Sequence, residues 1–169
     1  MKRALEDARR DVVLNRTLED ARRDVERYEQ ALTAPDTRAR ACLEQGIVAE
    51  RQQQWAEAAQ RYRQALDMPG AAPDTRACAC HGLGVVAYAQ KNFLEARQHY
   101  SRAIELQPTY AEAYRNRGLT WAAEVPPDYE RALADARRAL ELDSAFEDAR
   151  RDIERYEQAL KRRNRNRPN

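Results

Sequence analysis

The stretch CHGLGVVAYAQKNFLEARQHYSRAIELQP, from Cys80 to Pro108, decides the fold of this chain. It carries a glycine at Gly84, then Ala96 four positions before Tyr100, and it ends in proline. Small residues let two helices approach closely, and aromatic rings fill the gaps between them. The stretch therefore predicts two packed helices joined by a turn.

Related stretches lie on both sides of it. APDTRARAC at Ala34–Cys42 returns as APDTRACAC at Ala72–Cys80. Glycines recur at Gly46, Gly84 and Gly118, spaced 38 and 34 residues apart. This period lies in the range of helical repeat arrays, so the chain is predicted to contain three helix–turn–helix units.

The repeated Ala-Pro-Asp motif predicts where two of the helices begin. Proline stops an earlier helix from running through, and an aspartate near a helix start can accept hydrogen bonds from free backbone N–H groups. We therefore expect Asp36 and Asp74 to cap the helices that follow them.

This pattern resembles the tetratricopeptide-repeat (TPR) family, whose units read W-x2-L-G-x2-Y, then A-x3-F, then P. The second unit matches best, because it combines Leu83-Gly84, Ala96-x3-Tyr100 and Pro108. The first unit keeps Gly46, Ala58-x3-Tyr62 and Pro69. The resemblance covers roughly 35–143 and implies an all-α fold, a right-handed superhelical stack of three hairpins with a flanking helix at each end.

The third unit departs from the family pattern in its second half. Pro126-Pro127 lengthens the turn, Ala132-x3-Ala136 replaces the pair of alanine and aromatic residue, and Ser144 stands where proline is usual. We therefore still expect a third hairpin here, but with packing that differs from the family pattern.

The two ends of the chain carry nearly the same helix. LEDARRDVERYEQAL at Leu18–Leu32 and FEDARRDIERYEQAL at Phe146–Leu160 differ at only two positions, and LEDARRDV also occurs at Leu5–Val12. Stacked hairpins need a terminal cap with a polar outer side, which the C-terminal copy is predicted to supply. The N-terminal copy either caps the front of the stack or docks on another copy of the protein. An engineered protein, or a fragment of a longer array, would also show this pattern.

Four parts are predicted: an N-terminal helical extension over 1–33, three hairpins over 34–144, a capping helix over 145–161 and a basic disordered tail over 162–169. Self-association, as a dimer in the favoured form, is predicted to use two apolar stripes. These are Leu18, Ala21, Val25, Tyr28 and Leu32 in the first copy and Phe146, Ala149, Ile153, Tyr156 and Leu160 in the second.

The family resemblance implies protein–protein recognition, in which the first helices of successive hairpins line a concave groove for an extended or helical peptide. The predicted groove residues are Arg40, Leu43, Ile47, Glu50, Cys78, His81, Val85, Tyr88, Glu112, Arg115, Asn116 and Leu119. They form an apolar strip bordered by charges of both signs, which suits an amphipathic peptide.

One subgroup of the family clamps the C-terminal carboxylate of heat-shock chaperones with Lys, Asn and Arg from the first helices. The matching positions here carry Leu43, Ile47, Gly82 and Glu112, and only Asn116 is compatible. An adaptor for chaperone tails is therefore not expected.

Composition narrows the function classes further. The net charge of +2 arises from interleaved arginines and acidic residues, which is typical of solvated helical faces, so a nucleic-acid partner is not expected. There is no phosphate loop, nucleophile motif or metal-ligand spacing, so we predict a non-enzymatic scaffold without cofactor or metal.

No membrane span or signal peptide is expected, and three cysteines without disulfide spacing favour reduced thiols in the cytoplasm. The alternative function is a self-assembly module.

Overall fold

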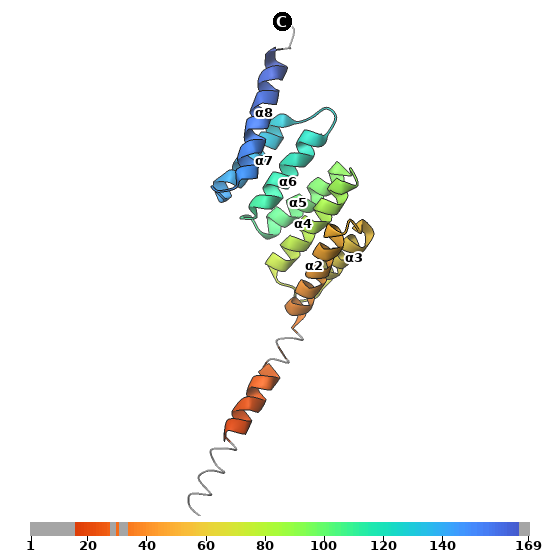
Figure 1. Ribbon diagram of the computed structural model, residues 1–169, viewed down its shortest axis with the longest axis vertical. Helices are drawn as coiled ribbons and strands as arrows, with labels where there is room; N and C mark the ends of the chain where they lie inside the picture. The colour runs from red at the N-terminus through yellow and green to blue at the C-terminus, as the bar shows by residue number, and fades with distance from the viewer. Residues whose placement is uncertain (1–15, 28–29, 31–33, 166–169) are drawn as a thin grey trace, which may run out of the picture.

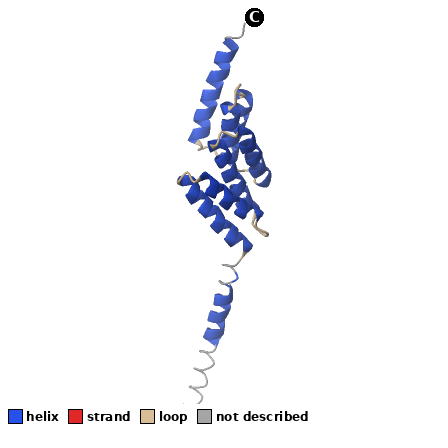
Figure 2. Ribbon diagram, turned by 90° about the vertical axis from the view of Figure 1, so that its right-hand side faces the viewer, coloured by secondary structure: helices blue, strands red, loops and turns tan. Residues whose placement is uncertain are grey.

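The computed structural model describes residues 16–27, 30 and 34–165, and all regular secondary structure in this part of the chain is helical (Figure 2). Residues 16–27 form an N-terminal helix. The helices that follow are α2 (Pro35–Arg51), α3 (Trp55–Asp67), α4 (Pro73–Ala89), α5 (Phe93–Leu106), α6 (Ala111–Ala123), α7 (Tyr129–Leu142) and α8 (Glu147–Arg165).

These helices build a stack of three hairpins. α2 pairs with α3, α4 with α5, and α6 with α7, while α3 packs on α4, α5 on α6, and α7 on α8 (Figure 1). The predicted fold class, an all-α stack of TPR-like hairpins with flanking helices, is confirmed. Each hairpin covers an apolar side of its neighbour, which a single hairpin could not bury alone.

Aromatic rings fill the space beside the glycines, as the sequence predicts. A Cβ atom added to Gly46 or Gly82 would lie 2.5 Å from ring carbons of Tyr62, and one added to Gly84 would lie 2.5 Å from the ring of Tyr100. Tyr62 and Tyr100 are 1% and 2% exposed, so neither ring can move far without opening the core. Glycine at these positions is therefore a packing requirement.

The prediction that Asp36 and Asp74 cap their own helices is wrong. α2 and α4 begin with proline, at Pro35 and Pro73, and neither has a side-chain N-cap hydrogen bond. The carboxylate of Asp36 instead accepts hydrogen bonds from the backbone N–H of Ala72 and the hydroxyl of Thr75, both at 2.8 Å. Asp36 thus joins the start of the first hairpin to the start of the second.

The third hairpin replaces the missing aromatic residue with other contacts. Ala132 and Ala136 are buried and lie in one cluster with Trp121, Tyr129 and Tyr156. The small alanines allow α6 to lie so close that the carbonyl oxygen of Ala132 would be 3.0 Å from a Cβ at position 118. The unit therefore packs tightly despite its departure from the family pattern.

Two of the carboxylates, predicted from the sequence to be solvated, are buried. Asp135 on α7 accepts two hydrogen bonds from Arg117 on α6, at 2.7 and 2.9 Å. Asp152 on α8 is 5% exposed and accepts from Arg115 at 2.8 Å. The prediction is wrong for these two residues because their arginine partners lie on a different helix and are distant in the sequence.

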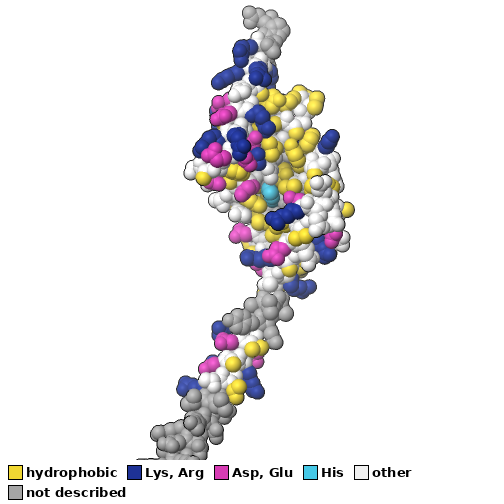
Figure 3. All heavy atoms as spheres, in the orientation of Figure 1, with side chains coloured by type: hydrophobic (Ala, Val, Ile, Leu, Met, Phe, Trp, Pro, Cys, Tyr) yellow, Lys and Arg dark blue, Asp and Glu magenta, His cyan; other side chains and the backbone are white. Residues whose placement is uncertain are grey.

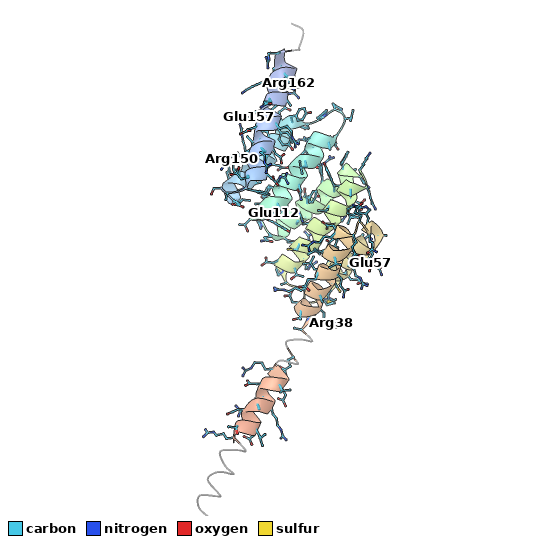
Figure 4. All side chains as sticks on the ribbon, in the orientation of Figure 1. Arg38, Glu57, Glu112, Arg150, Glu157 and Arg162 are labelled. Carbon is cyan, nitrogen blue, oxygen red and sulfur yellow. The ribbon has the colours of Figure 1, made fainter. Side chains whose placement is uncertain are left out.

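α8 covers the end of the stack. Ala149 and Tyr156 are 0% and 1% exposed, and Ile153 packs against the same cluster that holds Ala132 and Ala136 of α7. The outer side of α8 carries charged residues, including Arg150 and Arg162, which are labelled in Figure 4. α8 therefore covers an apolar side of α7, and its role as a terminal cap stays a prediction.

Candidate peptide-binding face

The first helices of the hairpins form one side of the stack. α2 contacts α4 and α4 contacts α6, whereas the second helices contact one another less. Closer approach on one side means that the stack curves toward it, and repeat proteins use such concave sides for binding. We call the side formed by α2, α4, α6 and α8 the inner face. In Figure 3, apolar side chains spread over the hairpins, while charged side chains gather along α8.

A histidine lies at the centre of the inner face. His81 on α4 packs against the rings of Tyr100 and Tyr110, with ring centroids 5.5 and 5.1 Å away. Its Nε2 lies 2.8 Å from the side-chain nitrogen of Asn116 on α6. Burial lowers the pKa of His81 to about 4, so the ring is neutral and Nε2 accepts the hydrogen bond from Asn116.

A hydrogen bond between side chains lies at the α2 end of this face. The hydroxyl of Tyr62 donates to the carboxylate of Glu50 at 2.6 Å. Burial, and then this bond to a carboxylate, raise the pKa of Tyr62 well above its usual value, so the hydroxyl keeps its proton. Leu43 packs against the core cluster that contains Tyr62, and Ile47 is 38% exposed.

An ion cluster lies at the α8 end. Arg115 on α6 contacts the carboxylate of Asp152 at 2.8 Å and that of Asp148 at 3.7 Å, and its guanidinium lies 5.7 Å from the ring centre of Phe146. The charge of Arg115 is thereby neutralised within the molecule. Glu112, labelled in Figure 4 near the start of α6, is exposed.

The predicted groove residues vary in exposure, and none of them is fully buried. Arg40, Ile47 and Glu112 are exposed, and the remaining residues are half-buried. Those are Leu43, Glu50, Cys78, His81, Val85, Tyr88, Arg115, Asn116 and Leu119. Val85 and Tyr88 also pack against a core cluster, and Arg40 pairs with Asp36 at 2.8 Å. The assignment of all twelve residues to a binding groove stays a prediction.

Sequence reasoning missed Tyr110, Asp148 and Asp152, which contact predicted groove residues. Tyr110 precedes α6 and was not on a predicted helical face, although an aromatic residue beside a turn is a signal of packing. Asp152 follows Ala149 by three positions and precedes Tyr156 by four, which places it on the buried side of α8. That spacing could have revealed Asp152.

The two predicted self-association stripes have different surroundings. Ala149 and Tyr156 are buried within their own chain and Phe146, Ile153 and Leu160 are half-buried, so the C-terminal stripe is covered while α8 is docked. In the N-terminal stripe Leu18, Ala21 and Val25 are exposed. Tyr28 and Leu32 lie outside the described residues.

Metal ligation, membrane insertion and thiol reactivity can each be assessed for the described residues. No three His, Cys, Asp or Glu side chains among them lie close enough to hold a metal ion. None of the helices described is both long enough and apolar enough to cross a membrane. Burial raises the pKa of the Cys80 thiol to about 11, which makes it a poor nucleophile.

Comparisons with known proteins agree with this architecture. A family profile described as "TPR repeat" matches residues 84–123. The first TPR of Spaghetti (RPAP3), solved with an HSP90 peptide of sequence SRMEEVD, is 25% identical with a TM-score of 0.65, covering 74% of this chain and 94% of that chain. No curated protein sequence gives a significant match.

Two further solved structures share the fold. The first TPR domain of human RPAP3 is 24% identical with a TM-score of 0.66, covering 76% of this chain and 97% of that chain. The Sgt2 TPR domain from Aspergillus fumigatus is 19% identical with a TM-score of 0.69, covering 80% and 88%. Residues 84–123 thus match a TPR repeat, and the stack of hairpins has the fold of solved TPR domains, which are in general protein-interaction modules.

Proposed function

We propose that the chain is a non-enzymatic scaffold that binds an amphipathic peptide or partner helix along its inner face. Binding depends on the apolar strip, which we define as Leu43, Ile47, Val85, Tyr88 and Leu119. The strip runs across the first helices of all three hairpins, so a bound segment contacts each hairpin in turn.

The observation that carries this proposal is the internal pairing of polar groups beside the strip. Asn116 is hydrogen-bonded to His81, Tyr62 to Glu50, and Arg115 to Asp152. A partner that competed for these groups would have to break an existing bond for each one it formed, which gives little net gain. The apolar side chains carry no such cost, because covering them only removes their surface from water.

The exposed part of the strip is suited to a small number of apolar anchors. Ile47 is 38% exposed, and the other four side chains are half-buried. Each of them therefore offers a small apolar surface to a partner while the rest of the side chain packs within the protein. A residue held by the core loses little freedom on binding, which leaves more of the contact energy for affinity. An amphipathic helix with apolar residues at i, i+3, i+4 and i+7 is the partner of matching chemistry.

A chaperone tail does not fit this face. The peptide bound to the first TPR of Spaghetti ends in two glutamates, a valine and an aspartate. Here the exposed Glu112 would repel such a peptide, and Leu43 and Ile47 supply no positive charge. We place the scaffold in the cytoplasm, where its three free cysteines would stay reduced.

A selection experiment tests the proposal. A library of amphipathic helical peptides is displayed and selected against the folded protein, with SRMEEVD as the comparison peptide. We expect selected binders whose affinity changes little with salt, and no measurable binding of SRMEEVD. Affinity that falls steeply with salt would contradict an apolar mode of binding.

A further inference from the structure

The N-terminal helix has no cover, although its near-copy at the other end is docked. All residues of 16–27 are exposed, with Leu18 at 53% and Val25 at 54%. Its ion pairs, Arg23–Asp20 at 3.1 Å and Arg27–Asp24 at 3.3 Å, lie within the helix itself. Figure 1 shows it beyond the end of the stack at which α2 lies.

In sequence, the N-terminal segment is joined to α2 with a different register from that of the second helices and the helices that follow them. α3, α5 and α7 each carry an alanine followed by leucine or isoleucine. Six residues separate this pair from the start of the next helix, namely 67–72, 105–110 and 141–146. After the equivalent pair Ala31-Leu32, only Thr33 and Ala34 precede α2. The missing four residues correspond to about one helical turn. By sequence register, the motif of this segment therefore lies about one turn out of the position that the motif of α3 takes on α4.

The front of the first hairpin is open at the place where such a helix would pack. Residues of α2 and α3 line a hollow of about 500 Å³ there, with Val48 52% exposed. Glu57, labelled in Figure 4, lies on its α3 side. The residue 38 positions later, Val86, is 4% exposed because it packs with Ala58, Ala59 and Tyr62. The surface that α3 covers on the second hairpin is thus uncovered on the first.

The N-terminal segment also resembles the helix that covers the second hairpin. RYEQAL at Arg27–Leu32 matches RYRQAL at Arg61–Leu66 of α3 at five of six positions. In α3 this motif supplies Tyr62 and Ala65, which are both buried. The segment therefore carries the residue pattern that the open front of the first hairpin would accept.

We propose that the N-terminal helix of one chain packs into the α2–α3 hollow of a second copy. The same contact in the opposite direction closes a two-fold dimer, in which each chain gives one helix and receives one. The register of the sequence before α2 does not match the hollow of the same chain, so the occupant comes from another copy. The surface under α8 is not the target, since the tethered α8 already covers it at high effective concentration.

Sedimentation velocity on the full chain tests this proposal, with far-ultraviolet circular dichroism to check folding. The variants are Val25→Glu in the helix, Val48→Glu in the hollow and, as a matched control, Leu94→Glu on α5. Leu94 is 61% exposed and lies outside both surfaces, and Val25 and Val48 are exposed enough for folding to persist.

We expect a dimer for the wild type and for Leu94→Glu, and half that mass for Val25→Glu and for Val48→Glu. A wild type that stays monomeric at the highest soluble concentration would overturn the proposal. A dimer that persists with Val48→Glu would also overturn it, because the helix would then dock elsewhere. Peptide binding on the inner face is a separate property, and neither result bears on it.

Discussion

The side-chain nitrogen of Asn116 on α6 lies 2.8 Å from Nε2 of His81 on α4, and this contact links the second and third hairpins across the inner face. Since an amide nitrogen can only donate, Nε2 must be unprotonated. The rings of Tyr100 and Tyr110 enclose the imidazole and exclude much of the water that would stabilise its charged form. The hydrogen bond and the burial both favour neutral His81.

Acid should therefore destabilise the protein through His81. Its pKa is about 4 in the folded chain and 6.5 without burial, so the unfolded state binds more protons between these values. The free energy of unfolding should fall from about pH 6.5 down to about pH 4, by up to about 3 kcal/mol. Urea unfolding at several pH values between about 6.5 and 4 measures this free energy.

His81→Gln is the control for this measurement, because glutamine cannot be protonated. The variant should lose the slope between these two pH values, whatever its stability at neutral pH. An unchanged slope would show that other groups cause the acid sensitivity.

Gly84 should not tolerate a side chain. A Cβ there would lie 2.5 Å from the buried Tyr100 ring, so Gly84→Ala should lower the free energy of unfolding by about 1–3 kcal/mol. Ala89→Leu, at an exposed position of the same helix, should change it by less than about 0.5 kcal/mol. Equal midpoints in urea for Gly84→Ala and wild type would show that the ring moves aside at no cost.

The duplicated helix supplies its own control for the buried ion pair at α8. Asp152→Ala leaves Arg115 without its closest partner and should cost about 2 kcal/mol. Asp24→Ala, at the same position of the exposed copy, should cost less than about 0.5 kcal/mol in dilute protein. Similar losses for the two variants would mean that the contact with Arg115 contributes little to stability.

Much of the fold could be predicted from local spacing. The spacing between Gly84 and Tyr100 is the same as that between Gly46 and Tyr62 in the preceding hairpin. This repeat predicts that the glycine and the ring lie together, and they are in contact in the structure. The stripe of Ala149, Ile153 and Tyr156 likewise predicts the packing of α8. Both features depend on the periodicity of one helix or hairpin, which a sequence displays directly.

Contacts between hairpins could not be predicted in the same way. Asp36 looked like a cap for α2, yet it accepts a hydrogen bond from Ala72, 36 residues later. Asp152 looked solvated beside Arg155, and its partner Arg115 lies 37 residues earlier. Such pairs depend on how one hairpin is placed on the next, and no single helical period contains that information.

The central claim is that the apolar strip of the inner face binds a peptide, and one affinity measurement tests it most directly. A peptide selected from the amphipathic library is titrated calorimetrically into wild type, Tyr88→Ala with Leu119→Ala, and the control Leu94→Ala. The account predicts that the double variant binds more than about 30-fold more weakly with its helical content unchanged, while the control binds like wild type. Equal affinity of the double variant and wild type would contradict the account.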